Sequence, residues 1–177
     1  MASEVEICNL ALGHLGDRAT VASINPPEGS AQAEHCQRFY PIARDTLLEM
    51  HDWGFAARRI TLAAVTSPTD AWQYAYAKPS DCIRARAILP PEAADDYAVQ
   101  WVGSGFEFAP PAAGYYVPQP FAMETLSTGS EVILTNTEDA VLRYTARVTD
   151  TTKFSQMFTM ALSWHLASLL AGPVVKG

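Results

Sequence analysis

The fold of this chain is decided by residues 144–174, which read YTARVTDTTKFSQMFTMALSWHLASLLAGPV. In the first part of this stretch, the character of the side chains alternates from one residue to the next. This pattern predicts a strand with one solvent-exposed and one buried face. Asp150 then offers a carboxylate to the free N–H groups of a first helical turn, so a helix is expected to begin there. Because Lys153 carries the only formal charge before Lys176, nearly every face of this helix needs protein against it.

A membrane is not expected to cover this helix. Its apolar run at residues 158–171 contains Ser163, His165 and Ser168, and a crossing needs about 20 apolar residues. At the N-terminus, acidic residues stand where a signal peptide would have basic ones. The sequence therefore predicts a soluble protein whose last helix is enclosed by its own domain or by neighbouring copies.

The periodicity of the remaining sequence predicts two further helices and a β region between them and the last helix. A Ser3 and Glu6 capping box opens a helix over residues 3–15. Another helical segment covers residues 31–52, where Pro41 predicts a bend or two abutting helices. The period then changes to two, with strands expected at residues 58–65, 72–77, 83–89, 131–135 and 140–148, and a hairpin at 99–108.

The predicted fold class is α+β, a helical core with an inserted antiparallel β subdomain. The N-terminal helical part is expected at residues 1–55, the β subdomain at 56–148, and a C-terminal helix packing on the N-terminal helices at 149–177. The length of 177 residues allows a sizeable buried core but makes a two-domain enzyme unexpected.

The charge and the cysteine content of the chain make some classes of function less expected than others. The formal net charge of −7, with few basic clusters, disfavours sequence-specific DNA recognition, which needs a basic surface. Cys8, Cys36 and Cys82 are odd in number and lack short spacings, which indicates reduced thiols that serve as small core residues.

The sequence contains few motifs that indicate catalysis or metal binding. No CxxC, HExxH or HxxxH spacing occurs, so neither a metal nor a cofactor is expected. Cys82 could act as a nucleophile only if the folded chain brought it close to a histidine that is distant in the sequence. Within the β region Asp95, Asp96 and Glu107 are the candidate carboxylates for glycoside hydrolysis, although Asp95 and Asp96 fit a solvated turn better. His165, in the apolar helix, is interpreted as a hydrogen-bonded core histidine.

Four segments taken in order resemble one known family. They are EICNLALGHLGD near the N-terminus, HDWGFAARRITLA at the first helix-to-strand junction, WQYAYAKPSDCIRAR, and the closing RYTARVTDTTKFSQMFTMALSWHLASLLAGP. Together they are similar to tail tubular protein A of short-tailed, podovirus-type phages and their prophage relatives, and the likeness covers nearly the whole chain.

The resemblance implies a structural virion protein that is not an enzyme. Such a head-to-tail adaptor forms a homo-oligomeric ring, typically a dodecamer, between the portal protein and a tail nozzle protein of the tail tubular protein B type. The genomic DNA passes through its channel without specific binding during ejection. The protein would stand in the virion at the portal vertex, and in the host cytoplasm during assembly.

Several residues are expected to make subunit or partner contacts in this ring. The helical wall would come from residues 31–52 and 154–170, and an aromatic, proline-rich loop would meet the downstream tail component. The candidate contact residues are Tyr40, Leu47, Tyr115, Tyr116, Phe121, Phe154, Met157 and Leu169.

Two points stay open at this stage. Relatives commonly carry a further C-terminal arm that reaches the portal, so either docking uses another surface here or the natural chain is longer. The alternative functions are a tail-associated carbohydrate or cell-wall hydrolase, with Asp95, Asp96 or Glu107 as acid and base, and a free cytoplasmic binding module.

Overall fold

The computed structural model describes residues 2–18, 20–91 and 119–174. The chain forms two compact units. The helical unit contains residues 1–56 and 147–177, so both ends of the chain contribute to it, and the β unit contains residues 57–146. The predicted α+β fold class, with antiparallel sheets and a long C-terminal helix, is confirmed.

The first helix, α1, spans Glu4–His14 and starts with the predicted capping box. The backbone N–H of Ser3 donates to Glu6 Oε2 at 2.6 Å, and the backbone N–H of Glu6 donates to Ser3 Oγ at 3.2 Å. Each side chain thereby satisfies a backbone donor that the first helical turn leaves free. Gly16 follows the helix with φ +76, a conformation that favours glycine.

The second helix, α2, spans Ala31–Met50 and contains Pro41. The side chain of Ser30 caps it by accepting a hydrogen bond from the backbone N–H of Ala33 at 3.2 Å. Of the two alternatives predicted at Pro41, separate abutting helices are not found, because the helix continues through the proline.

The C-terminal helix, α3, spans Gln156–Val174, so the prediction that it starts at Asp150 was wrong. Asp150 instead caps a short 3-10 helix, Thr151–Lys153, by accepting a hydrogen bond from the backbone N–H of Thr152 at 3.0 Å. Phe154 then adopts an extended conformation, which separates the two helices. Ser155 Oγ accepts from the backbone N–H of Phe158 and serves the first turn of α3.

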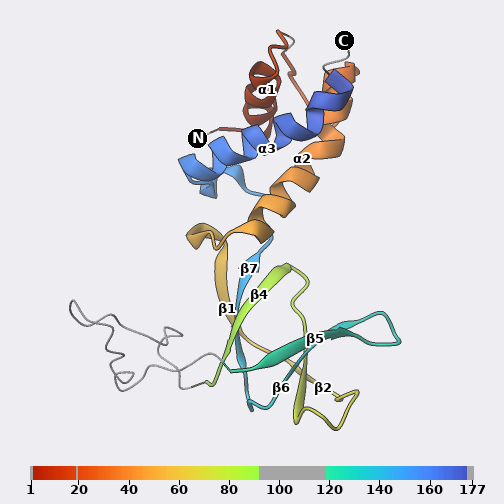
Figure 1. The fold of residues 1–177 in the computed structure, drawn as a ribbon, viewed down its shortest axis with the longest axis vertical. Coiled ribbons are helices and arrows are strands. Elements are labelled where there is room, and N and C mark those ends of the chain that lie inside the picture. The colour runs from red at the N-terminus through yellow and green to blue at the C-terminus, as the bar shows by residue number, and fades with distance from the viewer. Residues whose placement is uncertain (1, 19, 92–118, 175–177) are drawn as a thin grey trace, which may run out of the picture. The chain divides into compact units, whose positions relative to one another are not determined.

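Within the helical unit, α3 packs against both α1 and α2 (Figure 1). Half of the α3 residues that this packing buries are leucines, and the whole set is Phe158, Leu162, Ser163, Leu166, Ala167 and Leu170. The remaining face keeps large exposed side chains, so the prediction that nearly every face would be covered does not hold within this unit.

By length and composition, α3 also satisfies the requirements for a membrane-spanning helix. The apolar run considered in the sequence was shorter than the helix that forms, which has 19 residues. The core helix of a soluble protein meets the same requirements, and α3 is partly buried against α1 and α2.

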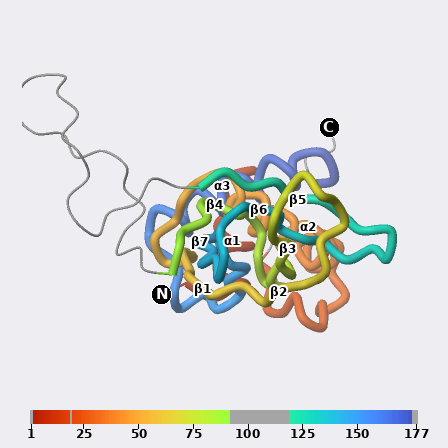
Figure 2. The backbone as a smooth tube through the Cα atoms, turned by 90° about the horizontal axis from the view of Figure 1, so that it is seen from below, coloured from red at the N-terminus to blue at the C-terminus, as the bar shows by residue number. Residues whose placement is uncertain are grey.

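The β unit contains two antiparallel sheets, whose strands can be followed in Figure 2. One has the order β1-β7-β4, formed by Ala57–Thr61, Val141–Ala146 and Cys82–Leu89. The other has the order β2-β3-β6-β5, formed by Ala64–Val65, Tyr74–Ala77, Glu131–Thr135 and Phe121–Thr125.

A shared hydrophobic cluster joins these sheets, with Ile88 and Leu142 from the first and Tyr76 and Ile133 from the second. The strand predicted at residues 58–65 is divided into β1 and β2, which belong to different sheets, and Leu62 between them is buried in the cluster. The strand β5 was not predicted, and the predicted hairpin at 99–108 lies outside the described residues.

Two adjacent residues of α3 test the packing of the helical unit. Phe158→Ala should lower the free energy of unfolding by about 3–5 kcal/mol, because it removes a fully buried ring from among aromatic neighbours. Met157→Ala, on the exposed side of the helix, should change it by less than about 0.5 kcal/mol. Urea denaturation of both variants measures the difference, and equal losses would contradict this packing.

Candidate functional site

Among the described residues, no group of three or more His, Cys, Asp or Glu side chains could hold a metal ion. The carboxylates Asp95, Asp96 and Glu107, on which the hydrolase alternative depends, lie outside the described residues.

One serine and one histidine do come together in the helical unit. His14 Nε2 lies 3.0 Å from Ser163 Oγ, and the Ser163 hydroxyl donates to the carbonyl of Met160 at 2.8 Å. Since the serine has one proton and gives it to that carbonyl, His14 is the donor in the other bond. Ser163 is also fully buried. This pair joins α1 to α3 and is not arranged as a nucleophile with its base.

The fold also brings together two of the cysteines, which the sequence spacing did not predict. The thiols of Cys8 on α1 and Cys36 on α2 are both buried and interact with each other. Their hydrogen bond raises the pKa of Cys8, as burial also does, and lowers the pKa of Cys36. Because both side chains are fully buried, the pair serves the packing of the two helices.

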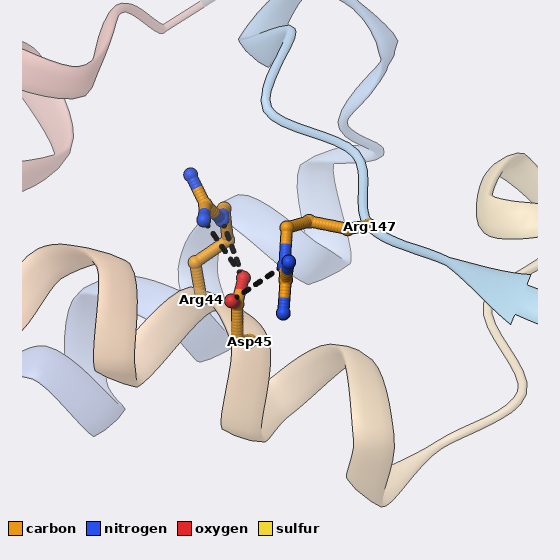
Figure 3. A network of polar contacts seen from close by, with 3 residues as sticks. All are labelled: Arg44, Asp45 and Arg147. Carbon is orange, nitrogen blue, oxygen red and sulfur yellow. Dashed lines mark hydrogen bonds and ion pairs between the residues drawn. The ribbon is translucent and has the colours of Figure 1, made fainter. Parts of the chain in front are cut away.

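A polar network connects α2 to the segment that follows β7. Arg44 Nε and Nη2 each lie 2.8 Å from Asp45 Oδ1, and Arg147 Nε donates to Asp45 Oδ2 at 2.9 Å. Figure 3 shows the Asp45 carboxylate between the two guanidinium groups. Because Arg44 is only 7% exposed, its charge depends on Asp45 for compensation.

The most conspicuous surface feature of the helical unit is apolar. Met157, Met160 and Trp164 are 71%, 51% and 56% exposed, and their spacing of three and four residues places them along one side of α3. We call these three residues the α3 patch. The ring of Trp164 stacks on His14 with centroids 3.7 Å apart, which holds the indole in place at the surface.

A second exposed apolar pair lies on α2. Ile42 and Met50 are 53% and 68% exposed, and we call them the α2 patch. Neither was among the predicted contact residues. The helical periodicity places Met50 in line with the buried residues Tyr40, Ala43 and Leu47, but Met50 is exposed at the end of α2.

The structure places the predicted contact residues in different environments. Tyr40, Leu47 and Phe154 are buried within the helical unit, and Phe121 is partly buried against the core of the β unit. Met157 is exposed and Leu169 is half-buried. Tyr115 and Tyr116 lie outside the described residues. Of the eight predicted residues, Met157 is thus the one in the α3 patch.

Comparison with known proteins adds no relative. No protein-family model matches the sequence, and no curated protein matches it at a significant level.

The Asp45 network gives a first test of this part of the helical unit. Asp45→Ala should lower the free energy of unfolding by about 1–3 kcal/mol, because it leaves the buried Arg44 guanidinium without its partner. Arg147→Ala is the matched control and should cost less than about 1 kcal/mol, because the Arg147 side chain is half exposed. Denaturant unfolding of both variants measures this, and a larger loss for Arg147→Ala would contradict it.

The buried Cys82 thiol predicts a decline of stability at alkaline pH. Burial raises the pKa of Cys82 from 9.0 to about 11, so the unfolded chain loses this proton at a lower pH than the folded one. The contribution of Cys82 is complete below pH 9 and is lost as the pH rises to about 11, amounting to about 3 kcal/mol. Cys82→Ala should show a shallower decline in denaturation curves recorded over this range. An unchanged slope would contradict the assignment.

Proposed function

We propose that this protein is a structural virion component, a head-to-tail adaptor that forms a ring between the portal and the tail nozzle of a short-tailed phage. The resemblance to tail tubular protein A suggests this function. The observation that carries it is the α3 patch, because exposed methionines and a tryptophan grouped on one helix are typical of a protein interface.

The two apolar patches support a ring in particular. A ring of identical copies needs a heterologous contact, in which one surface of a copy meets a different surface of its neighbour. The α3 patch and the α2 patch lie on different helices of the same unit and could supply these two surfaces. A two-fold dimer would need only one of them.

Two properties are consistent with a passive channel: the negative net charge, and the lack of a metal or nucleophile site among the described residues. The net charge of −7 would repel the phosphates of a passing duplex and keep DNA from adhering to the wall. The described residues contain no candidate metal site, and their Ser163 and His14 pair is not arranged for nucleophilic attack. A structural role in the virion requires neither.

A charge placed in the α3 patch tests the ring. Met157→Asp should leave the fold intact, because the side chain is exposed, and should abolish assembly by placing a charge in an apolar contact. Ser155→Asp is the matched control, since it places the same charge on a nearby exposed residue outside the α3 patch and aspartate can still cap α3. Circular dichroism checks folding, and electron microscopy of assembled heads with each variant checks for a collar at the portal vertex.

The outcomes of this test are distinct. A closed collar with the control and none with a folded Met157→Asp supports the adaptor. Normal collars with both variants would show that the α3 patch is not the contact. Absence of the protein from the virion would refute the function itself, and binding of the wild type to lipid vesicles would assign α3 to a membrane instead.

A further inference from the structure

One face of the β1-β7-β4 sheet carries four arginines, to which the adaptor function assigns no role. Arg59 on β1 and Arg143 on β7 are direct cross-strand partners, so their side chains leave the sheet on the same face. On β4, Arg84 is the partner of Thr145, and Arg86 Nε donates to Thr145 Oγ1 at 2.8 Å. Because Thr145 and Arg143 are two residues apart on β7, the four arginines share this face. We call Arg59, Arg84, Arg86 and Arg143 the arginine face.

The arginine face is the side of the sheet turned away from the core of the β unit. The other side carries Leu142 and Tyr144, which belong to the hydrophobic cluster shared by the two sheets. Two members of the arginine face, Arg59 and Arg84, are exposed, and the other two are half-buried. Solutes in the surrounding water can therefore reach these charges.

No acidic residue on the three strands offsets this charge. The strands β1, β7 and β4 contain five arginines and neither Asp nor Glu. The fifth arginine, Arg58, lies on the opposite face of β1 and pairs with Asp81 at 2.6 Å. Like charges on directly opposite residues, as at Arg59 and Arg143, destabilise a sheet. An anionic ligand would remove this repulsion, which is unexpected in a chain with a net charge of −7.

The residue type and the density of charge indicate which anion fits. A guanidinium presents N–H donors in pairs that match the oxygens of a phosphate or a carboxylate. Each of the four guanidinium groups also interacts within the chain, and five N–H donors can serve such a contact and an oxyanion together. Neighbouring strands are about 4.8 Å apart, so the four charges lie on three strands within roughly 10 Å. Double-stranded DNA carries one negative charge per about 1.7 Å of its axis and so presents several phosphates to an area of this size.

We propose that the arginine face binds the phosphate backbone of double-stranded DNA without reading its sequence. The negative charge of the remaining chain opposes this contact, so the dissociation constant should be about 10⁻⁶ to 10⁻⁴ M, as in other non-specific binding. Contacts of this kind let a protein slide along DNA. The proposal goes beyond the adaptor function and is compatible with a duplex that passes the protein.

Two adjacent residues of β1 provide a matched pair of variants. Arg59→Gln removes one charge from the arginine face, and Arg58→Gln removes the same charge from the other side of the strand. Binding of the whole protein to a labelled duplex of about 20 base pairs is measured by fluorescence anisotropy at about 20 mM salt. Arg59→Gln should weaken binding at least fivefold and Arg58→Gln less than twofold, while circular dichroism checks that both variants fold. Equal losses, or no binding of the wild type, would overturn the proposal.

The salt dependence of binding counts the phosphate contacts. The slope of log affinity against log salt concentration should become shallower by about 0.9 in Arg59→Gln. The double variant Arg59→Gln with Arg84→Gln, which changes the two exposed members of the face, should lose about twice as much slope. A slope that stays the same in the double variant would show that these arginines do not contact phosphates.

Two further probes test whether the ligand is the DNA backbone. Duplexes of unrelated sequence should bind with affinities within about threefold of one another, because phosphates carry no sequence information. Polyglutamate of the same total charge should compete at least tenfold less well than unlabelled duplex. Equal competition would assign the arginine face to an acidic protein and overturn the assignment to DNA. Because ring assembly is not measured, a failure of this proposal is distinguishable from a failure of the adaptor function.

Discussion

The structure of the helical unit depends on the packing of one face of α3 on α1 and α2. The residues of this face are Phe158, Leu162, Leu166 and Leu170, and they lie more than 100 residues along the chain from α2. The β unit between α2 and α3 has its own core and so behaves as a folded insertion. The entropic cost of closing a loop grows only slowly with its length, so such an insertion is tolerated.

Local signals in the sequence account for much of the fold. The capping box at Ser3 and Glu6 forms as predicted, and the strands β6 and β7 lie where alternation indicated. The errors have local physical causes. Asp150 can cap a 3-10 turn as well as an α-helix, and for this reason the start of α3 was predicted at the wrong residue. The strand β5 has intermediate and exposed residues throughout, and alternation gave no signal for it.

The candidate sites were much less predictable, because they arise from residues far apart in the chain. Cys8 and Cys36 were each predicted to be small core residues, yet their contact depends on how α1 and α2 meet. Tyr40 was expected to contact a partner but is buried, and its unpaired hydroxyl can be recognised only from the fold. Composition also could not show that α3 is covered on one face and leaves Met160 and Trp164 exposed.

The exposed face of α3 has a different physical capacity from its buried face. The α3 patch provides apolar area and van der Waals contacts, and flexible methionine side chains tolerate small changes in the shape of a partner. The buried face instead fixes the position of α3 on α1 and α2. A substitution on the exposed face therefore need not impair the fold of the unit.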